Sequence, residues 1–189
     1  NGCGSNLVVI NKKKVNFHKT QNEFKAHLNY NHYYMTKEWQ YKNIEPKIIV
    51  EKLLFNDDYI LPNDLKFHCF NGKVEFIQLD IDRSTSSRKR NFYSVNWELL
   101  EFNWCPVKDG IPIWPNSNTF IEKPSRLKEM IDISEKLSKV FKYVRVDLYE
   151  FNQQVYFGEL TFHHGSGVEI FTPVSLDTFY GKYIVNLEL

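Results

Sequence analysis

The stretch VRVDLYEFNQQVYFGELTF carries the acidic residues of this chain whose spacing best suits chemistry. We expect two strands joined by a three-residue turn centred on Gln153, which places Asp147 opposite Glu159. The same pairing places Arg145 opposite Thr161 on the same face, because residues two apart on a strand share a face. Directly opposed side chains have Cβ atoms about 5 Å apart, and like charges there destabilise a sheet. A sheet rarely tolerates such a pair without a compensating positive charge.

Arg145 or a bound divalent cation could supply that charge, and a cation would do so more completely. An oxygen ligand set without His or Cys favours Mg²⁺ or Mn²⁺ over Zn²⁺. The alternative is an exposed acidic pair on a solvated sheet face, and the spacing by itself leaves both open.

Two glycine-bearing segments could approach a phosphate group. NGCGSN opens the chain at residues 1–6, and FHHGSGVEIFTP includes the end of the strand that carries Glu159. Backbone N–H groups of such loops can point at phosphate oxygens. NGCGSN matches neither GxGxxG nor the Walker A pattern, so a glycine turn without a ligand is the alternative.

The rest of the chain predicts an α+β or mixed α/β fold, with strands and helices interspersed. Asn71-Gly72 lies between two strand-like runs and is a strong hairpin signal. We expect strands at 7–10, 47–54, 65–70, 73–82, 143–150 and 154–162, and a hairpin over 90–100 that turns at Val95-Asn96. Helices are predicted at the capping box Thr20/Glu23, around 36–41 and from Ser125 to Phe141, with a loop over 103–120.

The bulk composition bears on which partners to expect. A net charge of +1 provides no field that would draw the chain to nucleic acid or acidic lipid. No apolar stretch approaches the roughly 18 residues that a membrane helix needs. The three cysteines form no CxxC pair, and we expect a reducing, cytoplasmic location.

Three further groups each allow two interpretations. The charged residues at 80–83 predict either a salt-bridged sheet edge or a substrate contact. The basic run at 88–90 predicts a solvated loop, or a contact to a polyanionic glycan. Trp97, Trp104 and Trp114 predict core or loop anchors, or sugar stacking.

Taken together, these strings resemble an ATP-grasp domain, most closely the TupA-like branch associated with teichuronopeptide and polysaccharide biosynthesis. The strings that carry the resemblance are NGCGSN, MTKEWQYKNIEPKIIVEKLL, LKFHCFNGKVEFIQLDIDR, KRNFYSVNWELL and RVDLYEFNQQVYFGELTFHHGSGVE. They occur in the family's order and cover nearly the whole chain. The resemblance implies two α+β lobes with mainly antiparallel sheets and a nucleotide cleft between them.

The resemblance also implies a role for individual positions. The glycine-rich loop would close over the ATP phosphates through Gly2, Cys3, Gly4, Ser5 and Asn6. The hinge strand would line the adenine through Glu51, Lys52, Leu53 and Leu54. Asp64 would contact the ribose, and Lys66 would face the phosphates.

The metal and substrate positions follow in the same way. Arg145 and Asp147 resemble the family's Arg-x-Asp, and Glu159 resembles the glutamate that bridges two Mg²⁺ ions. Thr161 stands where many ATP-grasp enzymes have asparagine, which implies a weaker second metal. Acceptor or carboxylate substrates would meet the loop residues His163, His164, Gly165 and Ser166.

Two family features are missing, namely a lysine on a strand before the glycine loop and a preceding substrate domain. We therefore expect the loop to follow a strand outside this sequence, with an incomplete small lobe at 1–50 and the hinge and large lobe at 51–189. The resemblance implies an ATP- and Mg²⁺-dependent ligase that joins a carboxylate to an amine or glycan-linked substrate. The alternatives are a non-catalytic nucleotide- or glycan-binding module and a glycosyltransferase of the same pathway.

Overall fold

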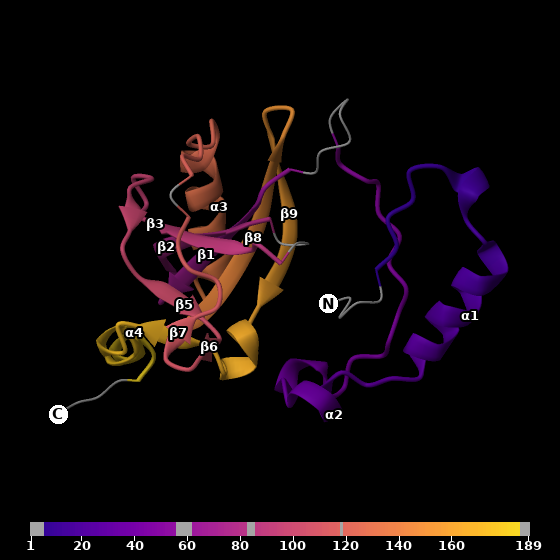
Figure 1. Ribbon diagram of the computed structural model, residues 1–189, viewed down its shortest axis with the longest axis horizontal. Coiled ribbons are helices and arrows are strands. Elements are labelled where there is room, and N and C mark those ends of the chain that lie inside the picture. The colour runs from indigo at the N-terminus through magenta and orange to yellow at the C-terminus, as the bar shows by residue number, and fades with distance from the viewer. Residues whose placement is uncertain (1–5, 56–61, 83–85, 118, 186–189) are drawn as a thin grey trace. The chain divides into compact units, whose positions relative to one another are not determined.

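The computed structural model describes residues 6–55, 62–82, 86–117 and 119–185. The chain divides into two compact units, residues 1–59 and 60–189. The second unit carries all the strands of the described residues, and the first is built from short helices and coil (Figure 1).

The first unit begins its main helix earlier than the sequence predicts. Helix α1 spans Phe17–Leu28, and Asn16 caps it by accepting a hydrogen bond from the Lys19 backbone N–H at 3.0 Å. The predicted capping box at Thr20 is therefore wrong. The second predicted helix is split into α2 (Tyr33–Thr36) and the 3-10 turn η2 (Trp39–Tyr41), because Lys37 adopts a φ of 60°. A further 3-10 turn, η1, covers Lys12–Lys14.

The strands predicted at 7–10 and 47–54 are wrong, since both segments are coil in the described residues. Their β-branched side chains are exposed, reaching 91% for Val50. β-Branched residues favour a pleated, half-buried strand surface. A strand forms, however, only where a second strand pairs with its backbone N–H and C=O groups. Neither segment has such a neighbour among the described residues.

The second unit is organised around an antiparallel sheet of six strands in the order β4-β3-β2-β1-β8-β9. Their bounds are β1 Asp64–Phe70, β2 Lys73–Ile81, β3 Lys89–Tyr93, β4 Leu99–Leu100, β8 Tyr143–Phe151 and β9 Gln154–Thr161. The predicted hairpins at Asn71-Gly72 and Val95-Asn96 are confirmed. The α+β class with mainly antiparallel sheets is likewise confirmed.

Each face of this sheet has its own cover (Figure 1). Helix α3 (Leu127–Ser138) packs on one face against β1, β2 and β8, through buried Leu127 and Met130. An aromatic cluster of Phe70, Phe76, Phe92, Phe102 and Phe171 lies at one end of the other face, against helix α4 (Ser175–Ile184).

The predicted loop at 103–120 contains three short strands. Strand β5 (Asn103–Cys105) pairs with β10 (Ile170–Thr172), and β6 (Val107–Lys108) pairs with β7 (Ile111–Pro112). The β6–β7 turn has Asp109 and Gly110 at φ values of 52° and 80°, as a tight hairpin requires. The loop prediction missed these strands because each has only two or three residues. The predicted anchoring role of tryptophan is confirmed for Trp97 and Trp104, which pack on the two cores.

The β8–β9 hairpin has the predicted pairing of Asp147 with Glu159, but its turn and its strand β9 differ from the prediction. Its turn has two residues, Asn152 and Gln153, and not three. A bulge at Gly158 then adds one residue to β9, so that Asp147 lies opposite Glu159 as expected. A Cβ atom at Gly158 would lie 2.8 Å from Tyr149 Cε2 and 2.9 Å from the Asp147 carbonyl oxygen. The bulge therefore needs a residue without a side chain.

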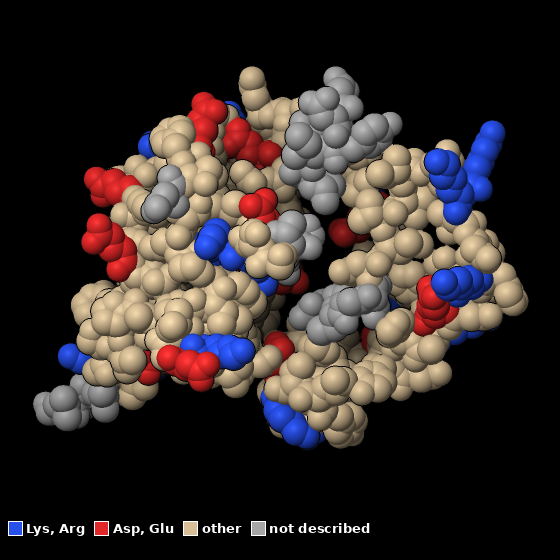
Figure 2. Space-filling view, in the orientation of Figure 1, with Lys and Arg blue, Asp and Glu red and all other residues tan. Residues whose placement is uncertain are grey.

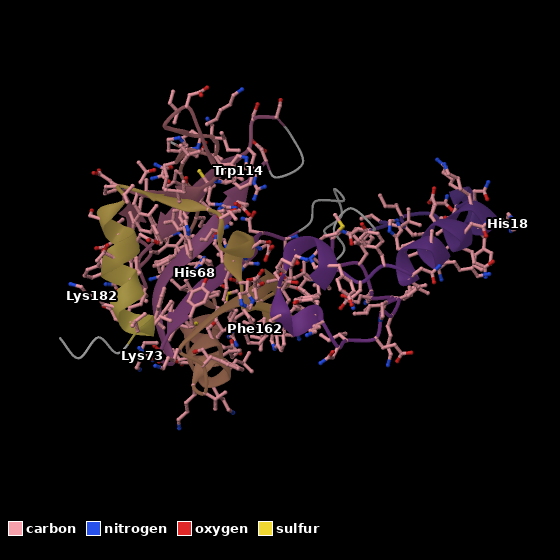
Figure 3. The ribbon with its side chains drawn as sticks, turned by 90° about the horizontal axis from the view of Figure 1, so that it is seen from below. His18, His68, Lys73, Trp114, Phe162 and Lys182 are labelled. Atoms are coloured by element: carbon pink, nitrogen blue, oxygen red, sulfur yellow. The ribbon has the colours of Figure 1, made fainter. Side chains whose placement is uncertain are left out.

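His68 is a fully buried polar residue beside the aromatic cluster, within the sheet in Figure 3. Gln78 Nε2 donates to Asp80 Oδ1 at 3.3 Å, which leaves Gln78 Oε1 to accept from His68 Nε2 at 3.0 Å. His68 Nδ1 therefore accepts from the Tyr143 hydroxyl at 3.0 Å. Burial, together with the charge of the Arg145 guanidinium, holds the pKa of His68 well below its ordinary value, so the ring is neutral in the folded protein.

We predict that Gly158→Ala lowers the free energy of unfolding by about 1–3 kcal/mol, because the methyl group cannot fit against Tyr149 and the Asp147 carbonyl. Denaturant unfolding measures the loss. Gly181→Ala is the matched control, because nothing lies within 4 Å of its Cβ position on α4. Equal stability of the two variants would contradict the role of the bulge.

We also predict that the free energy of unfolding falls as the pH decreases below about 6.5, because the unfolded chain then takes up a proton on His68 that the folded chain does not. Denaturation between pH 5 and 7.5 measures this slope. His68→Gln should reduce this slope, and the same change at exposed His18 is the matched control. An unchanged slope in His68→Gln would refute the assignment.

Candidate functional site

A group of four charged side chains and one hydroxyl side chain lies on the sheet face opposite α3. We call it the charged cluster; its members are Lys66, Arg145, Asp147, Glu159 and Thr161. The register of three neighbouring strands brings them together, since Asp147 pairs with Lys66 on β1 and with Glu159 on β9. The alternation of each strand directs these positions to one face.

Arg145 holds the cluster together. Its Nε and Nη2 donate to the two carboxylate oxygens of Asp147, both at 2.7 Å. Nη2 also lies 3.3 Å from Glu159 Oε1 and 2.9 Å from Thr161 Oγ1. The predicted convergence of Asp147 and Glu159 is confirmed, and so is the compensating charge of Arg145.

Asp147 also accepts from Lys66 Nζ at 3.1 Å, and Lys66 pairs with Asp64 on the other side. Lys66 and Asp147 are each 2% exposed, whereas the Glu159 side chain is 47% exposed. Burial alone would lower the pKa of Arg145, but the Asp147 carboxylate more than offsets it and raises this pKa above its ordinary value. Arg145 is therefore a cation, and Glu159 is the carboxylate of the cluster that is most open to ligands.

The oxygen donors of the cluster fit Mg²⁺ better than a softer metal. Asp147, Glu159 and Thr161 provide two carboxylates and a hydroxyl, without His or Cys. Within the described ranges, no group of three or more His, Cys, Asp or Glu side chains could hold a metal alone. Mg²⁺ commonly uses one or two carboxylates together with water and substrate phosphates. The donor set thus fits Mg²⁺ that arrives with a phosphate ligand.

The loop after β9 brings a further residue to the cluster. This loop contains the 3-10 turn η3 (His164–Gly167), in which Gly165 and Ser166 have φ values of 54° and 53°. His163 and Ser166 are exposed, but His164 is buried, with its Nδ1 2.8 Å from Arg145 Nη1. The prediction that groups His163 and His164 as substrate contacts did not anticipate their different burial.

A second set of buried charges was predicted only in part, at Asp80. Asp80 accepts from Arg90 Nε at 2.8 Å and from Arg88 Nη2 at 2.9 Å, and Arg90 Nη1 donates to Glu169 Oε2 at 2.6 Å. The solvated loop predicted at 88–90 is wrong, because Arg90 is 3% exposed on β3. The salt-bridged interpretation of Asp80 is confirmed. Burial raises the pKa of Asp80, but the two arginines outweigh it and lower the pKa below its ordinary value.

The predicted nucleotide contacts are only partly described. Asn6 and the residues at 51–54 belong to the first unit, where they are in coil. Asp64 lies beside Lys66 in the second unit. The roles of these residues stay predictions. Four further predicted contacts, Gly2, Cys3, Gly4 and Ser5, lie outside the described residues.

A pocket of about 400 Å³ opens between the turn at Val95-Asn96 and the start of α3. None of the predicted site residues lines it. The candidate site is therefore identified by the convergence of charges and not by this pocket.

The face drawn in Figure 2 carries charges of both signs. On the face shown in Figure 2, acidic and basic side chains are interspersed with uncharged surface. In the part of the chain that the structure describes, no helix combines the length and apolar character needed to cross a membrane.

The model of one protein family, described as TupA-like ATPgrasp, matches residues 1–185. Comparisons with curated proteins and with solved structures found no match. The family match covers nearly all of the 189 residues and includes both units and the whole charged cluster. The chain belongs to the TupA-like ATP-grasp family.

Proposed function

We propose that this chain is an ATP- and Mg²⁺-dependent ligase that activates a carboxylate as an acyl phosphate and joins it to an amine. The observation that carries the proposal is the convergence of Asp147, Glu159, Arg145 and Lys66 on one face of the sheet. Family membership supports an ATP-dependent, ligase-like enzyme. The TupA-like branch favours a place in cell-surface polysaccharide biosynthesis.

The acidic members of the cluster would hold the metal. Asp147 and Glu159, with Thr161 beside them, provide oxygen ligands for Mg²⁺ bound to ATP, and Mn²⁺ suits the same donors. The metal would neutralise phosphate charge. Thr161 Oγ1 donates to Glu159 Oε1 at 3.0 Å, so the hydroxyl orients this carboxylate.

The basic members would bind the phosphates. Arg145 and Lys66 present only hydrogen-bond donors, and a buried guanidinium stabilises developing phosphoryl charge without reorganising. Asp147 keeps both cations in place before the nucleotide arrives. Under this proposal the remaining nucleotide contacts are the glycine-rich loop at 1–6, the segment at 51–54 and Asp64.

The reaction would proceed in two transfers. A substrate carboxylate oxygen attacks the γ-phosphorus, the bond to the β-phosphate oxygen breaks, and ADP leaves. The amine nitrogen then attacks the acyl carbon, phosphate leaves with the C–O bond electrons, and the nitrogen loses a proton to solvent. The protein supplies position and charge, which is the main catalytic requirement of phosphoryl transfer. The acceptor substrate would contact the loop after β9 at exposed His163 and Ser166 and at Gly165.

A specific observation favours a second function, a nucleotide- or glycan-binding module without turnover. Both oxygens of Asp147 already accept hydrogen bonds from buried cations, so its charge is balanced without a metal. Thr161 is also a weaker metal ligand than a carboxylate. Turnover of ATP separates this function from the ligase.

We predict that Glu159→Gln weakens the binding of Mg²⁺ with a nonhydrolysable ATP analogue by more than about tenfold, because it removes the most exposed carboxylate charge. Asp147→Asn should weaken binding at least as much. Titration calorimetry measures both, and unfolding curves establish that the variants are folded. Glu122→Gln changes an exposed glutamate outside the cluster and should bind like the wild type. Unchanged affinity in Glu159→Gln would count against the metal role.

We predict that the protein releases ADP from Mg-ATP when the correct carboxylate and amine are present, and that Arg145→Lys lowers kcat by about 100-fold or more. Lysine keeps the charge but loses the planar set of donors. A coupled ADP assay with a panel of amino acids and acidic glycans measures this. Nucleotide binding without ADP release from any pair would support the binding module. Preferential binding of UDP- or GDP-sugars would point to a glycosyltransferase.

A further inference from the structure

The loop residue His164 lies between the two sets of buried charges. Its side chain is 3% exposed, and its ring packs 4.3 Å from Trp104 and 5.0 Å from His68, measured between ring centroids. Nδ1 lies 2.8 Å from Arg145 Nη1, and Nε2 lies 2.8 Å from Glu169 Oε2. Each ring nitrogen faces a charged side chain of the protein, so neither is directed at a substrate.

The neighbours of His164 determine where its proton lies. A guanidinium carries donors only, so Arg145 Nη1 must donate and His164 Nδ1 must accept. Nδ1 therefore carries no hydrogen, and in the neutral ring the hydrogen is on Nε2. Glu169 Oε2 lies 2.8 Å from Nε2, although the pair does not meet the geometry of a hydrogen bond. The ring is held as one tautomer between a cation and a carboxylate.

Glu169 is itself held in place. Arg90 Nη1 donates to Glu169 Oε2 at 2.6 Å and also to the Trp104 carbonyl oxygen. Trp104 Nε1 donates back to the Glu169 carbonyl oxygen at 3.3 Å. The position of Glu169 thus depends on β3 and β5, which lie outside the charged cluster.

The backbone of the loop permits this contact. Gly165 has a φ of 54°, and a Cβ atom there would lie 2.5 Å from Glu169 Cγ. A residue with a side chain would push Glu169 away from His164. The glycine therefore lets the loop fold back so that residue 169 reaches residue 164.

The charge state of His164 is consistent with the tautomer that has its proton on Nε2. Burial, followed by the charges of Arg145 and Arg90, lowers the pKa of His164 well below its ordinary value, so the ring is neutral at neutral pH. A protonated ring could not accept from Arg145, and two cations would then face each other.

We infer that His164 is a positioning residue: as a neutral acceptor whose tautomer Glu169 supports, it fixes the orientation of the Arg145 guanidinium. Arg145 then uses Nη1 for His164, Nε for Asp147, and Nη2 for the remaining oxygens of the cluster. The role of an oriented Arg145 in binding ATP rests on the proposed function, but the orientation itself does not.

The first test needs no variant. Nuclear magnetic resonance of the ¹⁵N-labelled protein should show one buried histidine with a neutral ring, its proton on Nε2, in contact with an arginine. The Nη resonances of Arg145 should be separate, because rotation about its terminal bonds is hindered. A proton on Nδ1, or averaged Nη signals in the wild type, would overturn the inference.

The second test uses paired variants at one position. Asn places its side-chain oxygen near the position of a histidine Nδ1, so His164→Asn should keep the acceptor, while His164→Leu removes it. We predict averaged Arg145 Nη signals in His164→Leu and separate signals in His164→Asn. Affinity for Mg²⁺ with the ATP analogue should fall about tenfold in His164→Leu and recover in His164→Asn.

His27→Leu, on exposed α1, is the matched control and should change neither readout. Signals that stay separate in His164→Leu would overturn the positioning role. If the arginine signals respond as predicted but the wild type binds no nucleotide, the positioning role stands and the proposed function fails.

Discussion

The bidentate ion pair between Arg145 and Asp147 is the interaction on which the candidate site depends. The two residues are 8% and 2% exposed, and an unpaired charge at that depth would be costly. Each partner therefore has to be present for the other to be tolerated. They lie two positions apart on one strand, so their pairing needs no long-range contact to form. Lys66 and Glu159 join from the two neighbouring strands, and this requires β8 to lie between β1 and β9.

The other face of strand β8 contributes side chains to the hydrophobic core. Val144, Val146 and Leu148 alternate with the charged positions and are fully buried in the core that α3 covers. A slip of β8 by one residue would bring these side chains to the cluster and move Arg145 and Asp147 into the apolar core. The cost of burying Arg145 and Asp147 in the apolar core therefore disfavours any other register between β8 and β1. On the β9 side, the register is set by the tight turn at Asn152-Gln153 together with the bulge at Gly158.

Local pattern explains which parts of this site could be predicted. Alternation in VRVDLYE and a short turn were enough to place Arg145, Asp147, Glu159 and Thr161 on one face. The turn length was wrong by one residue and the bulge restored the register, so the correct pairing depended on two features that offset each other. His164 could not be oriented in advance, because a loop with positive φ values has no side-chain period. The burial of Arg90 depends on Glu169, far away in the sequence. The strand predictions at 7–10 and 47–54 were wrong because the β propensity of a segment does not indicate whether a second strand is present to pair with it.

The balance of charge in the cluster suggests an order of binding under the proposed function. The two carboxylates and two cations of the cluster balance each other, and Asp64 beside Lys66 adds one formal negative charge, which leaves a net charge of −1 for these five charged residues. A polyanionic triphosphate would be repelled by that excess if it came alone. A divalent cation held by Asp147 and Glu159 would convert the net charge to +1 and would compete with Arg145 and Lys66 for the carboxylate oxygens, which would free both cations to bind phosphate. The ion and the nucleotide should therefore bind together, and Arg145, still held through Nη1 by His164, would exchange its carboxylate partners for phosphate oxygens without turning away.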